Sequence, residues 1–149
     1  MSLSAGNIAG DNQVVGFQLH DSGLLGLVLD VEAGELVVRL QRVDRRVVVI
    51  HLRGVGDAGF DCFRNGAIVF GVFLWNPADA SFDKYLAQTA WEVVFGKDVL
   101  GERLQEVVAD IVKRRDFNHL VLFDCSTYGG YVAALCREID IEVLSEGGT

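Results

Sequence analysis

Residues 23–53 read GLLGLVLDVEAGELVVRLQRVDRRVVVIHLR, and this stretch decides the fold. Apolar side chains recur there at every second position in three segments, which is the period of a β-strand. Gly34, within the E-A-G-E stretch at 32–35, supplies a turn after the first segment, and Val43-Asp44 supplies one after the second. One face of each segment carries Leu25, Leu27, Leu29 and Val31, then Leu36, Val38 and Leu40, then Arg46, Val48, Ile50 and Leu52. Three strands joined by short turns predict an antiparallel meander.

The third strand runs into a glycine-rich segment, VVVIHLRGVGDAG at 47–59. Gly54, Gly56 and Gly59 have the G-x-G-x-x-G spacing of a dinucleotide-binding loop, which must be followed by a helix in a βαβ unit. Asn65-Gly66, a strong hairpin signal, follows too soon for such a helix, and the preceding strands are antiparallel. We therefore interpret the glycines as part of a loop between strands and expect no cofactor.

The second half of the chain mixes both periods. Residues 67–75 are apolar on both faces and predict a central strand. Asn76-Pro77 and Asp98 are typical helix starts, and they predict helices over 77–95, ended by Gly96, and over 98–115. Residues 117–125 and 131–144 predict two last strands joined by S-T-Y-G-G, although 131–138 also fits a short helix.

These elements together predict one α+β domain over residues 17–145. Its mainly antiparallel sheet of about six strands has two consecutive helices packed on one face. Residues 1–16 are expected to form a flexible arm and residues 146–149 a tail.

Composition excludes several classes of protein. Half of the residues are hydrophobic and the mean hydropathy is +0.30, yet the apolar runs are shorter than the ~20 residues of a membrane-spanning helix. No secretory signal opens the chain, so we expect a soluble, cytoplasmic protein without a membrane partner. The net charge of −8 argues against nucleic-acid binding.

The charge is unevenly distributed. Residues 39–53 hold five arginines and one aspartate, a local charge of +4, which leaves −12 on the other residues out of the total of −8. A basic strip on an acidic, apolar-rich body predicts self-association as a homodimer. The arginines of this strip are Arg39, Arg42, Arg45, Arg46 and Arg53.

Few residue patterns indicate chemistry. His20-Asp21 lacks the further ligands of a metal-dependent phosphohydrolase and is typical of a turn before a strand. His119 and Cys125 are six residues apart on one predicted strand, roughly 20 Å, and cannot form a nucleophile pair. The three cysteines, Cys62, Cys125 and Cys136, are expected to be buried thiols, and no set of residues has metal-ligand spacing. The candidate binding residues are His20, Asp21, Trp75, Asp124, Ser126 and Tyr128.

Four segments carry a resemblance: LHDSGLLGLVLDVEAGELVVRL, IHLRGV, NGAIVFGVFLW and FDCSTYGGYVAALCREIDIEV. In this order they resemble a loose group of small, mostly uncharacterised bacterial α+β proteins, some of which are immunity proteins of polymorphic toxin systems. The resemblance implies a protein that binds and blocks a partner, with no catalytic residues to transfer.

Two functions are therefore expected from the sequence. The first is a non-enzymatic protein-binding module of bacterial origin, an immunity-like antagonist whose acidic surface attracts a basic partner. The alternative is a small enzyme or small-molecule-binding protein with a pocket between sheet and helices, lined by Asp124, Tyr128, His51 or Cys125.

Overall fold

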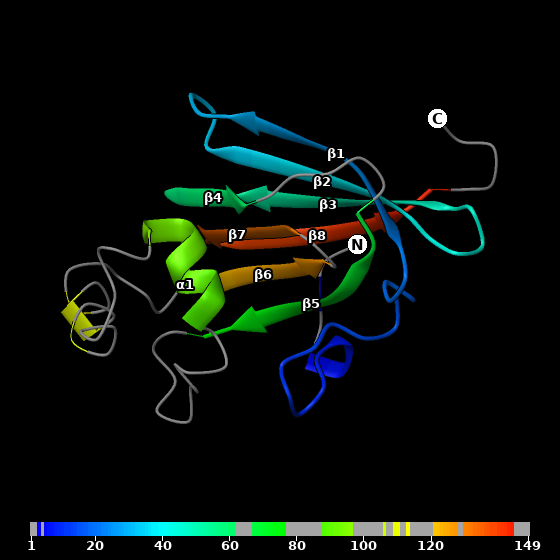
Figure 1. Ribbon diagram of the computed structural model, residues 1–149, viewed down its shortest axis with the longest axis horizontal. Helices are drawn as coiled ribbons and strands as arrows, with labels where there is room; N and C mark the ends of the chain where they lie inside the picture. Colours follow the sequence, from blue (N-terminus) through cyan, green and yellow to red (C-terminus); the bar gives the residue numbers. More distant parts are fainter. Residues whose placement is uncertain are drawn as a thin grey trace.

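The structure is a computed structural model that describes residues 3, 5–61, 67–76, 88–96, 106, 109–110, 113, 121–127 and 130–144. These residues form two four-stranded antiparallel sheets and one α-helix (Figure 1). Sheet 1 has the order β1 (Gly23–Asp30), β2 (Glu35–Gln41), β3 (Val47–Arg53) and β8 (Glu138–Val143). Sheet 2 has the order β4 (Asp57–Asp61), β7 (Gly130–Cys136), β6 (Val121–Thr127) and β5 (Val69–Trp75). The helix is α1 (Gln88–Phe95), and a 3-10 helix, η1, covers Ala5–Asn7.

The meander predicted for residues 23–53 is present. β1 pairs with β2, and β2 with β3, in antiparallel registers that place Leu36 opposite Leu52 and Val38 opposite Ile50. A bulge between Leu24 and Gly26 shifts the register of β1. Leu24 therefore shares a face with Leu27 and not, as the simple alternation predicted, with Gly26 and Val28.

The two sheets share one long antiparallel ribbon. β3 runs into β4 and β7 runs into β8, so the β3–β8 ladder continues into the β4–β7 ladder, as Figure 1 shows. At the junction the Gly56 amide donates to the Leu135 carbonyl (3.1 Å), and the Arg137 amide donates to the Arg53 carbonyl (2.9 Å). The glycine-rich segment therefore forms a bend in a continuous ribbon.

The sheets also meet at the start of β1. The Leu24 amide donates to the Ala67 carbonyl (2.8 Å), and the Val69 amide donates to the Ser22 carbonyl (2.7 Å). Between these two connections the inward faces of both sheets form one hydrophobic core. Its fully buried members include Leu36, Leu40, Ile50, Leu52, Phe123, Cys125, Cys136 and Ile141.

Helix α1 packs on the outer face of sheet 2, over β4 and β7 (Figure 1). Trp91 is fully buried there, as are Ala133 and Leu135 of β7. Gly59 lies under the helix, because a Cβ at that position would overlap the backbone carbonyl of Val93. The helix ends at Phe95, and Gly96 follows with φ +89°, as predicted for a glycine helix end.

The predicted fold class was wrong. The described residues hold eight strands in two sheets with one short helix, and not two helices on a single sheet of about six strands. One source of the error is the bend at Gly54 and Arg137, which divides two long strands between the sheets. Residues 131–138, for which strand and helix were both open, are strand except at the bend, and the predicted strand 131–144 is divided into β7 and β8. The predicted second helix and residues 77–87 of the first lie outside the description, apart from isolated positions.

β5 was expected at the centre of a sheet and lies at the edge of sheet 2. Residues 12 and 14, which belong to the predicted N-terminal arm, pair with the outer side of β5. The Val14 amide donates to the Val72 carbonyl, and the Leu74 amide donates to the Asn12 carbonyl. No helix in the described part of the chain has the length and apolar character needed to cross a membrane.

Candidate functional site

His20 and Asp21 lie in a turn that leads into β1. The Ser22 amide donates to the Leu19 carbonyl (3.1 Å), and Asp21 has φ +63°. His20 Nδ1 lies 3.1 Å from the Asp21 carboxylate, and both side chains are more than half exposed. The His20 ring also contacts the Phe70 ring, with 5.9 Å between their centroids. The pair therefore lies beside the start of β5.

Trp75 and Ser126, from β5 and β6, line a common cavity of about 390 Å³ beside α1. Phe70, Phe73 and Tyr131 supply further aromatic walls. The rings of Phe73 and Trp75 stack with 6.0 Å between centroids and 10° between planes. The structure thus brings two predicted binding residues together, while His20 contacts Phe70, one of the residues that line the cavity.

Asp124 and Tyr128 complete the predicted set. The backbone of Asp124 pairs with Phe73 and Ala133, but its side chain and all of Tyr128 lie outside the description. Asp11, Phe73 and Tyr131 also line this cavity, and the sequence did not predict them as binding residues. Alternation along β5 already separated Phe73 and Trp75 from the core-facing Val72 and Leu74, and this pattern could have predicted an aromatic outer face.

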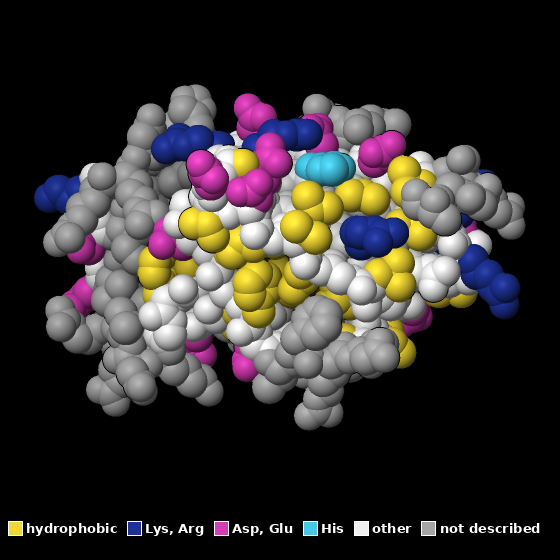
Figure 2. All heavy atoms as spheres, turned by 90° about the horizontal axis from the view of Figure 1, so that it is seen from above, with side chains coloured by type: hydrophobic (Ala, Val, Ile, Leu, Met, Phe, Trp, Pro, Cys, Tyr) yellow, Lys and Arg dark blue, Asp and Glu magenta, His cyan; other side chains and the backbone are white. Residues whose placement is uncertain are grey.

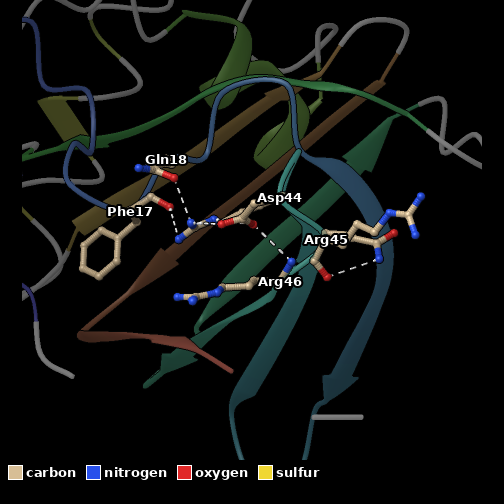
Figure 3. Close-up of polar contacts among 7 residues, drawn as sticks. Phe17, Gln18, Asp44, Arg45 and Arg46 are labelled. Carbon is tan, nitrogen blue, oxygen red and sulfur yellow. Dashed lines mark hydrogen bonds and ion pairs between the residues drawn. The ribbon is translucent and has the colours of Figure 1, made fainter. Parts of the chain in front are cut away.

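Arg42 connects the β2–β3 turn to the N-terminal segment. Its partners Phe17, Gln18 and Asp44 are labelled in Figure 3. Its guanidinium donates to the Phe17 carbonyl (3.3 Å), to Gln18 Oε1 (2.8 Å) and to both carboxylate oxygens of Asp44. The hydrogen bond from Arg42 holds the pKa of the Asp44 carboxyl below its ordinary value. The Asp44 carboxylate also accepts a hydrogen bond from the Arg46 backbone amide (3.1 Å). Arg42 therefore has hydrogen-bond partners both in the β2–β3 turn and in the N-terminal segment.

The other arginines of the strip differ in their surroundings. Arg53 forms an ion pair with Asp140 of β8. Arg45 is exposed in the turn with φ +71°, and Arg39 and Arg46 are exposed. Arg39 lies on β2 opposite Val49 and beside Gly26. The predicted basic strip is therefore partly neutralised within the fold.

β1 forms the outer edge of sheet 1. Only residues 21–24 continue the pairing toward β5, and no described residue pairs with the outer edge from Leu25 to Asp30. Leu25, Val28 and Leu29 are exposed along this edge, and Val28 has an exposed fraction of 61%. Figure 2 views the side on which β1 and β2 lie in Figure 1, and it shows hydrophobic side chains lying between acidic and basic ones.

His51 and Cys125, named for the alternative function, lie apart. His51 faces outward on β3 opposite Asp140, whereas Cys125 is fully buried in the core between the sheets. Burial also raises the pKa of the Cys136 thiol to about 12. Within the described residues, no group of three or more His, Cys, Asp or Glu side chains could hold a metal ion.

The glycine-rich bend faces a smaller cavity of about 160 Å³, formed with the β1–β2 turn. There the Val55 amide donates to the Gly34 carbonyl (2.9 Å).

In comparisons with known proteins, the chain shows no significant match to any family model or to any curated sequence. The candidate surfaces are therefore assessed from their geometry.

Proposed function

We propose that this protein is a non-enzymatic protein-binding module that binds through the outer edge of β1, with a second copy of the chain as its partner. The observation that carries the proposal is the apolar edge from Leu25 to Asp30, which has no described partner strand. An edge strand offers unpaired backbone groups to another strand, and proteins commonly blunt such edges with lysine or proline. This edge has neither residue, and Asp30 is its one charge.

The charges beside β1 favour one alignment of two copies. In a two-fold antiparallel pairing centred on Val28, Asp30 of each copy faces Gly26 of the other. Gly26 has open space where a Cβ would lie, and Arg39 is its neighbour on β2. Because strands lie ~4.8 Å apart, the Cα atoms of Arg39 and of Asp30 in the second copy would be roughly 10 Å apart, within reach of both side chains.

Alignments shifted by one residue lack this pairing. Centring on Leu27 places Asp30 opposite Leu24, whose side chain is on the core face, and centring on Leu29 places Asp30 opposite Val28, whose neighbour on β2 is Val37. Neither alignment brings the carboxylate opposite Gly26, the residue that pairs with Arg39. Of the five arginines predicted for self-association, this geometry uses Arg39. Since a single strand pair buries little area, we expect a weak, concentration-dependent dimer.

Analytical ultracentrifugation at low salt tests the proposal. We expect wild-type protein to approach twice the 16.3 kDa monomer mass as its concentration rises. Val28→Lys should remain monomeric, because two lysines would meet at the dimer axis. Val43→Lys is the matched control: Val43 lies in the β2–β3 turn, is 77% exposed, and takes the same change of charge. A monomer at every concentration, or equal loss in both variants, would contradict the proposal.

Cross-linking tests the alignment itself. In a Cys62→Ser background, Val28→Cys should form a disulfide between copies under mild oxidation, because directly opposed Cβ atoms lie about 5 Å apart. Val43→Cys should not. Arg39→Ala should weaken the dimer roughly threefold to tenfold, the effect of two exposed ion pairs, and should reduce its dependence on salt.

The resemblance to immunity proteins implies the same class of function, since those proteins bind and block a partner. The acidic net charge of −8 favours a basic partner by electrostatic steering. β1 would then be the surface that such a partner shares with the second copy, and Val28→Lys would disrupt both complexes.

A further inference from the structure

The outer face of sheet 2 carries a second surface that is independent of β1. We propose that the cavity between the N-terminal segment, β5 and α1 binds a small arylalkylammonium ion, which is an aromatic ring carrying a protonated aliphatic amine. Its volume of about 390 Å³ lies within the ~300–1,000 Å³ of typical ligand pockets, toward the small end.

The walls of the cavity are aromatic. Among them, Trp75 is 4% exposed and Phe70 is 46% exposed. The Phe73 ring extends over Gly71, 2.9 Å from where a Cβ would lie, and its plane is within 10° of that of Trp75. Stacked rings on an outward strand face suit a flat apolar ligand, and ring faces also attract cations.

Among the described residues of the lining, Asp11 supplies a carboxylate. Asp11 lies in the wall, and its Oδ1 accepts a hydrogen bond from the Gln13 amide (3.1 Å). Gln13 is itself held against Phe73 by a β-bridge. The N-terminal segment therefore positions the carboxylate beside the aromatic rings, where it favours a ligand with a positive charge.

The rest of the described lining is neutral and polar. Thr89 of α1 and Ser126 of β6 supply hydroxyl groups, and the described lining holds no lysine or arginine. Hydroxyls can accept hydrogen bonds from an ammonium group. In the described lining, aromatic faces and the Asp11 carboxylate together favour an amine over a neutral or acidic molecule of the same shape.

Three probes of similar size test the chemistry: 2-phenylethylamine, 2-phenylethanol and phenylacetate. Calorimetric titration should give the amine a dissociation constant on the order of 1 mM or tighter. The alcohol should bind roughly fivefold more weakly and the acid most weakly of the three. Trp75 lines the cavity, so tryptophan emission gives a second readout. No binding of any probe at several-fold this concentration, or an amine that binds no better than the acid, would overturn the proposal.

Three variants locate the site. Asp11→Asn keeps an oxygen for the Gln13 amide and should reduce the preference for the amine, while leaving alcohol binding unchanged. Phe70→Ala should weaken all probes at least roughly fivefold. Phe60→Ala is its matched control, a 42% exposed phenylalanine on β4 that lines the neighbouring cavity with Asp61 and Glu92. Equal loss in both phenylalanine variants, or an unchanged preference in Asp11→Asn, would contradict the site.

Discussion

Arg42 lies where the β2–β3 turn meets the N-terminal segment, and its guanidinium contacts both. It contacts Asp44 two residues away and Gln18 at a distance of 24 residues in the sequence. The largely buried side chain holds the segment before β1 against the turn. At the scale of single residues, the arginines of the basic strip therefore differ. The Arg42 side chain is largely buried and hydrogen-bonded within the fold, whereas Arg39, Arg45 and Arg46 are exposed.

Arg42→Ala should lower the free energy of unfolding by about 1–2 kcal/mol, because the Phe17 carbonyl and Gln18 lose a charged donor. Arg46→Ala is the control, since Arg46 is exposed and its side chain has no hydrogen bond within the described residues. That substitution should change the value by less than about 0.5 kcal/mol. Urea denaturation followed by circular dichroism measures both, and equal losses would show that Arg42 has no special structural role.

At the scale of elements, the glycines at 54, 56 and 59 have different tasks despite their motif-like spacing. Gly54 has φ +65°, and a Cβ there would lie 2.9 Å from Cβ of Arg137. Gly59 lies directly under the backbone of α1. Gly56 does not have a positive φ. Gly54 therefore permits the bend, and Gly59 permits the close approach of α1.

Gly54→Ala and Gly59→Ala should each lower stability by about 1–3 kcal/mol, the first through backbone strain and the second by displacing α1. Gly56→Ala, between them, should cost clearly less than either. Thermal denaturation of the three variants gives the comparison. If Gly56→Ala were the most damaging of the three, the bend would depend on a feature other than the φ of Gly54 and the contact with α1.

At the scale of the whole molecule, the core between the sheets encloses a thiol that resists ionisation. Cys136 is fully buried, and its pKa is raised from 9.0 to about 12 by desolvation. Below about pH 9 the thiol is protonated in both states, so it adds no pH dependence. Between about 9 and 12 only the unfolded chain loses the proton, and the folded state is therefore destabilised as pH rises.

Wild-type protein should consequently lose about 1.4 kcal/mol more stability between pH 8 and pH 10 than Cys136→Ala loses. Each variant is compared with itself at the two pH values, which cancels the packing change caused by the substitution. Urea denaturation at both pH values supplies the four free energies. The same loss in both proteins would mean that Cys136 ionises as readily in the folded state as in the unfolded one.

The sequence by itself determined those parts of the fold that depend on neighbours along the chain. Alternating apolar residues and short turns defined the β1–β2–β3 meander, and the S-T-Y-G-G link correctly joined β6 to β7. Gly96 marked the end of α1 for the same reason, since a helix end is set within a few residues.

Only the tertiary structure decided how the strands were divided between the two sheets and which distant residues came together. The bend that assigns β3 and β4 to different sheets depends on Arg137, 83 positions beyond Gly54, and the cavity joins Asp11 to Tyr131. Periodicity records which side of a strand is apolar, but it does not record which distant segment covers that side. Trp75 and Ser126 therefore line one cavity only because the strands around them are in place.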